Sequence, residues 1–334
     1  MLLQLKNFKV SLAFLSVLLL LVLAACGDSE GTAQGEENDQ PAESNQSDND
    51  EDATEDPAEE EVAGNDWPEK INMGVIPAED QTSASDRVNE FAEELATHLG
   101  IEVDVFLGTD YNAVIEAMRT ENIDIAFFGP FAYVLASERS GAEVFSIGGK
   151  SEEEIYYTSA IIVPKDSDAE SIADLEGKDF LFVDPASTSG HIFPRAKVIE
   201  DLGVTNDEVE SVFGSVTFSG SHDASILAIV NGDADGAAIA TDVMDAMLDQ
   251  GVINEGDFKI IASSDPIPRG PDAYRSNLPE DLKEAIREFY YSYENERFFE
   301  ERGINGFYPV EDSAFDVVRR TAEALGMSPE ELLN

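Results

Sequence analysis

The chain has 334 residues, with 70 acidic side chains against 20 basic ones and a formal net charge of −50. A protein this acidic has no basic surface to replace the counterions of a phosphate backbone, so nucleic-acid binding is excluded. Its single cysteine excludes an internal disulfide and a cysteine-based metal site.

Residues 1–25 have the pattern of a lipoprotein signal peptide. Lys6 and Lys9 precede an apolar run at 10–22, and Leu23-Ala24-Ala25 stands directly before Cys26. The run is too short to serve as a lasting membrane span. We expect cleavage after residue 25, lipidation of Cys26 and a location on the extracytoplasmic face of the cell membrane. The alternative, a buried structural thiol, is disfavoured because Cys26 directly follows such a segment.

The segment after Cys26 is strongly acidic. Between Gly27 and Asp66 it has 16 acidic residues, no Lys or Arg and almost no apolar side chains. Such a segment cannot bury a core, so residues 26–66 are predicted to be a disordered, self-repelling tether. The rest of the chain, from Trp67 onward, is long enough for one large domain or two lobes.

From Trp67 onward, short β-branched runs alternate with amphipathic helices, which is typical of βαβ units. In the helix expected at 84–99, for example, Val88, Phe91 and Leu95 share one face. In chain order we expect strands at 71–76, 101–107, 123–128 and 144–147, and helices at 84–99, 111–119 and 131–139. These elements make up a first lobe, residues 67–160.

An extended run at 156–163 leads into a second set of the same units, which we assign to a second lobe, residues 161–265. Its expected helices are 171–175, 190–202, 224–231 and 242–250, and its expected strands are 179–183, 212–218, 236–240 and 258–262. A further extended run and helices at 279–293 and 313–325 are expected to return residues 266–334 to the first lobe. The predicted fold is α/β with two lobes, each a mainly parallel sheet flanked by helices, and a hinge of two crossings beside a ligand cleft.

The turn from Phe182 to His191 joins a predicted strand to a predicted helix and contains three consecutive hydroxyl side chains, Ser187, Thr188 and Ser189. The first N–H groups of a helix have no intrahelical partner, and the helix dipole is positive at that end. Hydroxyls and free amides at one helix start therefore suit an oxyanion. Ordinary helix capping is the alternative, although one hydroxyl is enough for a cap.

A second strand-to-helix turn, from Phe218 to Ser225, has small residues around His222. We expect His222 to donate a hydrogen bond to the same anion. The alternative is a solvent-facing capping residue.

Several segments then occur in an order that resembles the phosphonate-binding proteins of ABC importers, a group that includes phosphite and phosphate binders. The segments are Asp110-Tyr111, Ile125-Ala126-Phe127-Phe128-Gly129-Pro130, Asp184-Pro185-Ala186-Ser187-Thr188-Ser189-Gly190-His191, Gly220-Ser221-His222-Asp223-Ala224-Ser225 and Ile267-Pro268. The resemblance covers about residues 71–308 and implies a type II periplasmic-binding-protein fold. It also implies capture of a phosphorus oxyanion for the permease and ATPase subunits of an importer. We expect a monomer without a cofactor or a metal ion.

The resemblance also assigns the binding residues. It implies that Ser187, Thr188 and Ser189 hold the phosphoryl oxygens and that His222 donates a hydrogen bond from the facing turn. It also implies that Tyr111 and Tyr156 close the pocket from the first lobe, and that Asp242 is an acidic residue that can meet a ligand amine. For the two tyrosines, a place in the core or on the surface is the alternative.

The chain departs from the family pattern at Gly270. Aminoalkylphosphonate binders have a second acidic residue there, after Ile267-Pro268 and one further residue, and a glycine cannot hold an ammonium group. A smaller ligand such as phosphite, phosphate or methylphosphonate is therefore at least as well matched.

Three other functions were weighed. Ligand sensing without transport, and binding of a different small anion such as a sulfonate, remain open. A hydrolase that uses Ser187 or Ser189 with His222 is disfavoured, because the residues from Trp67 onward contain no G-x-S-x-G elbow and no H-E-x-x-H site.

Overall fold

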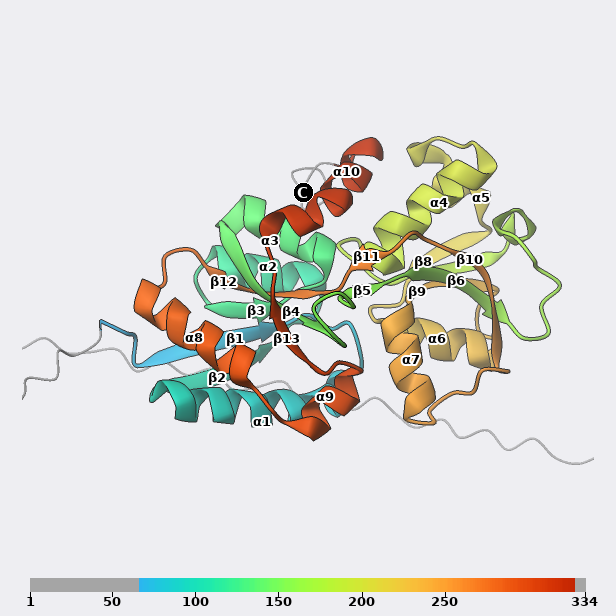
Figure 1. Cartoon of the computed structure of the whole chain (residues 1–334). Helices are drawn as coiled ribbons and strands as arrows, with labels where there is room; N and C mark the ends of the chain where they lie inside the picture. Colours follow the sequence, from blue (N-terminus) through green and yellow to red (C-terminus); the bar gives the residue numbers. More distant parts are fainter. Residues whose placement is uncertain (1–65, 328–334) are drawn as a thin grey trace, which may run out of the picture. The chain divides into compact units, whose positions relative to one another are not determined.

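The computed structural model describes residues 66–327 of the chain (Figure 1). The predicted signal peptide, the lipidation site Cys26 and the acidic tether up to residue 65 lie outside the described residues. Within residues 66–327, no helix has both the length and the apolar character that crossing a membrane requires.

A six-stranded sheet forms the first lobe, with the strand order β13-β4-β12-β3-β1-β2. Its strands are β1 Lys70–Val75, β2 Glu102–Leu107, β3 Ile125–Phe127, β4 Ala142–Gly149, β12 Pro271–Arg275 and β13 Gly306–Pro309. Strands β12 and β13 come from the C-terminal part of the chain and lie beside strands from its N-terminal part (Figure 1). Two segments far apart in the sequence therefore build this lobe.

A five-stranded sheet forms the second lobe, with the strand order β10-β6-β9-β7-β8. Its strands are β6 Ser159–Pro164, β7 Asp179–Phe182, β8 Ser215–Phe218, β9 Gly236–Ala240 and β10 Phe258–Ser263. The chain passes between the sheets twice, and the two passages pair antiparallel as β5 Tyr156–Tyr157 and β11 Ile267–Pro268. This short ladder corresponds to the predicted hinge.

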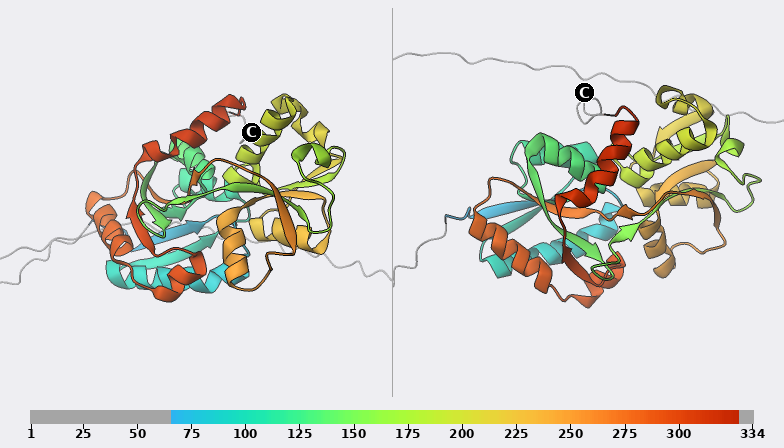
Figure 2. Two further views of the ribbon diagram at one scale, coloured as in Figure 1. Left: turned by 45° about the vertical axis from the view of Figure 1, so that its right-hand side comes forward. Right: turned by 45° about the horizontal axis from the view of Figure 1, so that its top comes forward.

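Helices cover both faces of each sheet (Figures 1 and 2). The helices are α1 Gln81–Leu99, α2 Tyr111–Arg119, α3 Pro130–Ser140, α4 Phe193–Leu202, α5 Val209–Val212, α6 His222–Asn231, α7 Thr241–Asp249, α8 Glu280–Ser292, α9 Glu296–Arg302 and α10 Asp316–Ala324, with short helical turns η1 Ile172–Leu175, η2 Thr188–Ile192, η3 Asn206–Glu208 and η4 Asp312–Phe315. Helices α1, α8 and α9 pack on one face of the first sheet, and α2, α3 and α10 pack on the other. In the second lobe, α6 and α7 pack on one face, and α4 and α5 on the other.

The alternation of side chains along the strands explains these layers. Along β6, Ile162 belongs to the cluster under α6 and α7, whereas its neighbours Ile161 and Val163 belong to the cluster under α4 and α5. Successive residues of a strand point to opposite faces, so a continuous apolar run is buried on both sides. This is why the β-branched runs identified the strands from the sequence.

The structure confirms the two-lobed α/β fold but corrects one of its details. Both sheets are mixed, whereas mainly parallel sheets were predicted. Strand β1 runs parallel to β2 and β3, and β7 runs parallel to β8 and β9, but the other pairings in the two sheets are antiparallel. The antiparallel strands flank the hinge passages, because a chain that crosses and then returns must reverse its direction.

Two local predictions also differ from the structure. The strand expected at 212–218 begins only at Ser215, because Val212 is the last residue of α5. Helix α9 and strand β13 were not predicted. Helix α9 has seven residues, which is shorter than the window over which helical periodicity can be recognised.

Asp272 is a carboxylate buried in the first lobe. It lies on β12 and is 4% exposed, and its Oδ2 atom accepts no hydrogen bond from the residues that the structure describes. Burial raises its pKa to about 7, against an opposing effect of the nearby Arg302. The native protein therefore retains a proton on Asp272 that the unfolded chain releases as the pH rises above 3.8.

This proton makes Asp272 a source of instability at high pH. Because the native state holds more protons than the unfolded state between pH 4 and 7, the free energy of unfolding falls as the pH rises through that window. We predict that Asp272→Asn raises the free energy of unfolding at pH 8 by up to about 4 kcal/mol, and that the gain shrinks as the pH falls toward 4. Urea denaturation at several pH values measures this.

Asp124 provides a matched control. It is also a buried aspartate, but its carboxylate accepts hydrogen bonds from the Arg275 guanidinium and from the N–H of Asn72, each at 2.7 Å. Removing its charge breaks a buried ion pair, so Asp124→Asn should destabilise the protein at pH 8 by about 3 kcal/mol. An equal loss of unfolding free energy in Asp272→Asn and Asp124→Asn would show that the burial of Asp272 does not destabilise the native protein.

Candidate functional site

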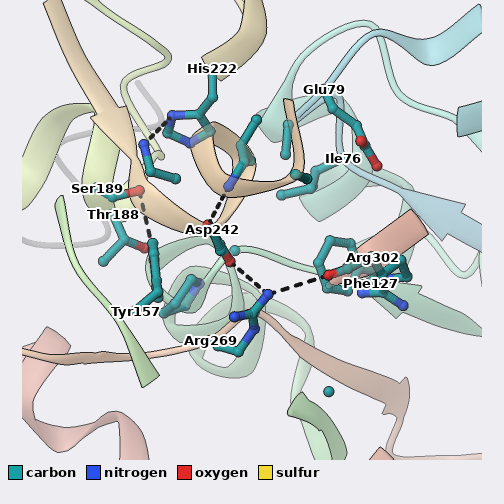
Figure 3. Close-up of a pocket in the computed structure, with 18 of the residues that line it drawn as sticks. Ile76, Glu79, Phe127, Tyr157, Thr188, Ser189, His222, Asp242, Arg269 and Arg302 are labelled. Atoms are coloured by element: carbon teal, nitrogen blue, oxygen red, sulfur yellow. Dashed lines mark hydrogen bonds and ion pairs between the residues drawn. The ribbon is translucent and has the colours of Figure 1, made fainter. Parts of the chain in front are cut away.

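A pocket of about 110 Å³ lies between the two sheets, next to the hinge. Residues from both lobes line it, and so do Tyr157 on hinge strand β5 and Arg269 directly after hinge strand β11 (Figure 3). Of the residues predicted to bind the ligand, the structure brings six together here: Ser187, Thr188, Ser189, His222, Tyr111 and Asp242. The seventh, Tyr156, is 53% exposed and does not line the pocket.

The turn that follows β7 supplies the three hydroxyl groups. The Oγ atom of Ser187 accepts a hydrogen bond from the N–H of Gly190 at 3.0 Å and so caps the helical turn η2, which leads into α4. A Cβ atom on Gly190 would lie 2.4 Å from the Cβ of Val183 and 2.8 Å from this Oγ. Only glycine therefore lets the helix start press against the end of the strand.

Each of the three hydroxyl oxygens accepts a hydrogen bond from the protein. Ser187 accepts from Gly190, Thr188 from the N–H of Phe131 at 2.8 Å, and Ser189 from the hydroxyl of Tyr157 at 3.2 Å. In these three bonds each hydroxyl acts as the acceptor, and the hydroxyls of Ser187 and Thr188 also bond to the phenols of Tyr111 and Tyr157. The three side chains are at most 2% exposed, and all three line the pocket. The turn thus places three hydroxyls at the pocket wall, and each can turn its proton toward an acceptor held there.

His222 adds a fourth donor from the first residue of α6. Its Nδ1 atom accepts a hydrogen bond from the N–H of Ala240 at 3.0 Å, so the ring proton is on Nε2. Burial lowers the pKa of His222 to about 4, which keeps the imidazole neutral at physiological pH. His222 therefore contributes a hydrogen-bond donor to the pocket without a charge.

The two lobes are in contact around the pocket. The N–H of His222 donates to the carbonyl of Ala78 in the first lobe at 3.0 Å, and the N–H of Tyr111 lies 3.4 Å from a carboxylate oxygen of Asp184 in the second. The bond from Phe131 to Thr188 also joins the lobes. The described conformation is therefore a closed one, in which both lobes complete the pocket wall.

Three tyrosines lie near the pocket: Tyr111 is the first residue of helix α2, and Tyr156 and Tyr157 form strand β5. Tyr111 is 2% exposed, and burial together with the nearby Asp184 raises the pKa of its phenol well above the usual value. On β5, Tyr157 lines the pocket, and its neighbour Tyr156 points away from it. Consecutive strand residues face opposite sides, so only one of the pair faces the pocket. The structure thus places Tyr157 in the pocket wall and leaves the predicted Tyr156 outside it.

Two arginines that were not predicted from the sequence also line the pocket. Arg269 follows β11 and forms an ion pair with Asp242 across 3.2 Å (Figure 3). Arg302, the last residue of α9, stacks over the ring of Phe127 with its guanidinium carbon 4.6 Å from the ring centroid. Burial lowers the pKa of Arg302. A search for cations directly after the predicted hinge passage would have found Arg269 in the sequence.

Known proteins with similar sequences identify the family to which this two-lobed structure belongs. A family model for the periplasmic substrate-binding proteins of phosphonate ABC transporters matches residues 73–315. The chain belongs to this family. It is 32% identical over 280 residues to the phosphate-import protein PhnD of Mycolicibacterium smegmatis, a match that covers 78% of this chain and 87% of that protein. The predicted family and the prediction of an importer's binding component are thus confirmed.

Solved structures of phosphonate-type binding proteins have the same fold. The binding protein component of an ABC phosphonate transporter from Pseudomonas aeruginosa matches with a TM-score of 0.70 and 26% identity, covering 78% of this chain and 87% of that one. PhnD1 from Prochlorococcus marinus, solved in complex with methylphosphonate, also gives 0.70, at 20% identity, covering 78% of this chain and 99% of that one. The second match shows likeness of fold.

The two buried histidines should make this phosphonate-type binding protein sensitive to acid. Burial lowers the pKa of both His222 and His191 from 6.5 to about 4, so between these values the unfolded chain binds more protons and stability falls as the pH falls. We predict that the loss of unfolding free energy between pH 7 and 4.5 is about 2 kcal/mol smaller in His222→Gln than in the unmodified protein. Denaturant titrations at the two pH values measure it.

The exposed His98 on α1 serves as the control for this measurement. The variant His98→Gln should lose as much unfolding free energy between the two pH values as the unmodified protein. An unchanged acid loss in His222→Gln would mean that this histidine is already protonated in the native state.

Proposed function

We propose that the protein captures a small phosphorus oxyanion (phosphonate, phosphite or phosphate) in the interlobe pocket and delivers it to the permease of an ABC importer. It acts as a monomer and makes or breaks no covalent bond. Lobe closure over the ligand and reopening at the permease are the whole of its mechanism.

The observation that carries this proposal is the set of hydroxyl groups at one helix start. Ser187, Thr188 and Ser189 line the pocket with groups that can donate to an oxyanion, and each already accepts a hydrogen bond from the protein. The neutral His222 is a further donor with its proton on Nε2. Hydrogen bonds to a charged group contribute roughly 1.5–3 kcal/mol each, which is enough for selective capture of an oxyanion.

The acidity of the whole chain does not prevent this. Salt screens the repulsion from distant carboxylates beyond about 8 Å at physiological ionic strength. Arg269 and Arg302 line the pocket, but so do Glu79, Asp242 and Glu301, and Arg269 is paired with Asp242. Local hydrogen-bond dipoles, and not a surplus of positive charge, therefore determine whether an anion binds.

We further propose that Cys26 is lipidated and that the acidic residues 26–66 tether the lobes to the outer face of the cell membrane. The support is the short apolar segment that ends in Leu23-Ala24-Ala25 directly before Cys26. Such an anchor keeps the binding lobes near the importer.

The ligand prediction is tested by calorimetric titration of the purified protein with phosphate, phosphite, methylphosphonate and sulfate. We expect a phosphorus anion to bind and to raise the free energy of unfolding by about 4 kcal/mol at a thousandfold excess over Kd. Ser189→Ala and His222→Ala should each weaken binding by roughly 10- to 100-fold, because each loses one hydrogen bond to the anion. His98→Ala, on the surface of α1, should bind normally. Full affinity in both pocket variants would refute the site.

The anchor prediction is tested by Cys26→Ser in intact cells. The unmodified protein should fractionate with membranes and carry acyl chains on Cys26 by mass spectrometry. The variant should lack the acyl mass and leave the membrane fraction, because Ser provides no thiol for acylation. Retention of the variant in membranes would show that another segment holds the protein there.

A further inference from the structure

The carboxylates that line the pocket are all paired with arginines. Among the described residues the pocket has three acidic side chains, Glu79, Asp242 and Glu301. Glu79 forms an ion pair with Arg87, Glu301 accepts from Arg297 at 2.9 Å, and Asp242 lies 3.2 Å from the Nη2 atom of Arg269. No carboxylate of this wall is left over to neutralise a positive charge on a ligand.

In the pair between Asp242 and Arg269, both partners line the pocket. Asp242 lies in the first turn of α7, in the second lobe, and Arg269 follows the hinge strand β11. Their side chains are only 21% and 14% exposed, so solvent screens the attraction weakly. The carboxylate of Asp242 is thus already paired with a cation of the protein, the guanidinium of Arg269.

The backbone of the hinge fixes Arg269 in this place. Its N–H donates to the carbonyl of Ile155 at 2.8 Å, next to the ladder of β5 and β11. Its Nη2 atom also lies 3.5 Å from the carbonyl oxygen of Arg302 (Figure 3). The first bond fixes the backbone from which the side chain extends; the guanidinium itself is held by the carboxylate of Asp242 and by the carbonyl of Arg302.

The next residue cannot supply a replacement carboxylate. A Cβ atom on Gly270 would lie 2.4 Å from the carbonyl oxygen of Phe128 and 3.0 Å from the ring of Phe127. Contacts below 3.0 Å to backbone are not tolerated, so this position holds only glycine in this conformation. The wall beside Arg269 therefore has no room for an acidic side chain.

We infer that the ligand carries no cationic substituent and that Arg269 determines this specificity. The inference rests on the proposed function, because it concerns the same pocket. A ligand ammonium would have to displace the guanidinium from Asp242 and would be repelled by Arg269 and Arg302. An oxyanion with a small neutral substituent, or with none, does not have to displace the guanidinium and has no ammonium group for the arginines to repel. The substrate class is thus phosphate, phosphite and short alkylphosphonates, and aminoalkylphosphonates are rejected.

The test compares three ligands by calorimetry on the purified full-length protein: methylphosphonate, 2-aminoethylphosphonate and propylphosphonate. The last two have the same number of heavy atoms and differ in a terminal ammonium against a methyl group. We expect the unmodified protein to bind methylphosphonate at least tenfold more tightly than 2-aminoethylphosphonate. Equal or tighter binding of 2-aminoethylphosphonate would overturn the inference. Absence of binding to every phosphorus ligand, phosphate and phosphite included, would instead refute the proposed function.

Substitution of Arg269 then distinguishes the effect of its charge on ligand affinity from the effect of the volume that it fills. Arg269→Gln frees Asp242, so the affinity for 2-aminoethylphosphonate should rise at least tenfold while that for propylphosphonate rises less than threefold. An equal rise for both ligands would show that Arg269 only fills space, and no rise would show that it has no part in specificity; either result overturns its assigned role.

Two further variants complete the design. The double variant Arg269→Gln/Asp242→Asn should lose the gain for 2-aminoethylphosphonate, because the freed carboxylate is then absent. Arg119→Gln, which removes an arginine that pairs with Glu116 on α2 away from the pocket, should leave all three affinities unchanged. Should Arg269→Gln fail to fold, Arg269→Met is measured in its place, and the ligand order of the unmodified protein remains decisive by itself.

Discussion

The buried hydroxyl groups after β7 are the constraint on which the rest of the site depends. Each of the three hydroxyls already accepts a hydrogen bond from the protein, and each can donate its proton to an acceptor in the pocket. Gly190 allows the approach of helix to strand that places them, and Phe131 and Tyr157 take up the lone pairs of two of them. The site is therefore matched to a ligand that accepts several hydrogen bonds at once.

The same bonds couple ligand binding to lobe closure. Thr188 is oriented by an N–H group of the opposite lobe, and the backbone of His222 donates to Ala78 across the cleft. Separation of the lobes would remove both contacts and expose the pocket to water. The hydroxyls and His222 all belong to the second lobe, so an anion bound to them favours the closed arrangement through the contacts it also makes to first-lobe residues of the pocket wall, such as Tyr111 and Arg302.

The fold was more predictable from the sequence than the pocket wall. Strand and helix periodicity depends on near neighbours in the chain, so the runs that became β6 and β9 were identified directly. The three consecutive hydroxyl residues of the turn could likewise be recognised in the sequence. The choice of Tyr157 over Tyr156 depends on how β5 is rotated, and the partner of Asp242 is 27 residues away at Arg269. Such contacts arise only when the lobes are packed together.

The measurement that tests this account most directly is a crystal structure of the protein with bound methylphosphonate. We predict that the phosphorus atom lies in the interlobe pocket, with its oxygens accepting hydrogen bonds from Ser189 and from Nε2 of His222. The ion pair between Asp242 and Arg269 should remain intact beside the methyl group. A ligand bound outside this pocket, or one whose oxygens touch neither the hydroxyl turn nor His222, would contradict the account.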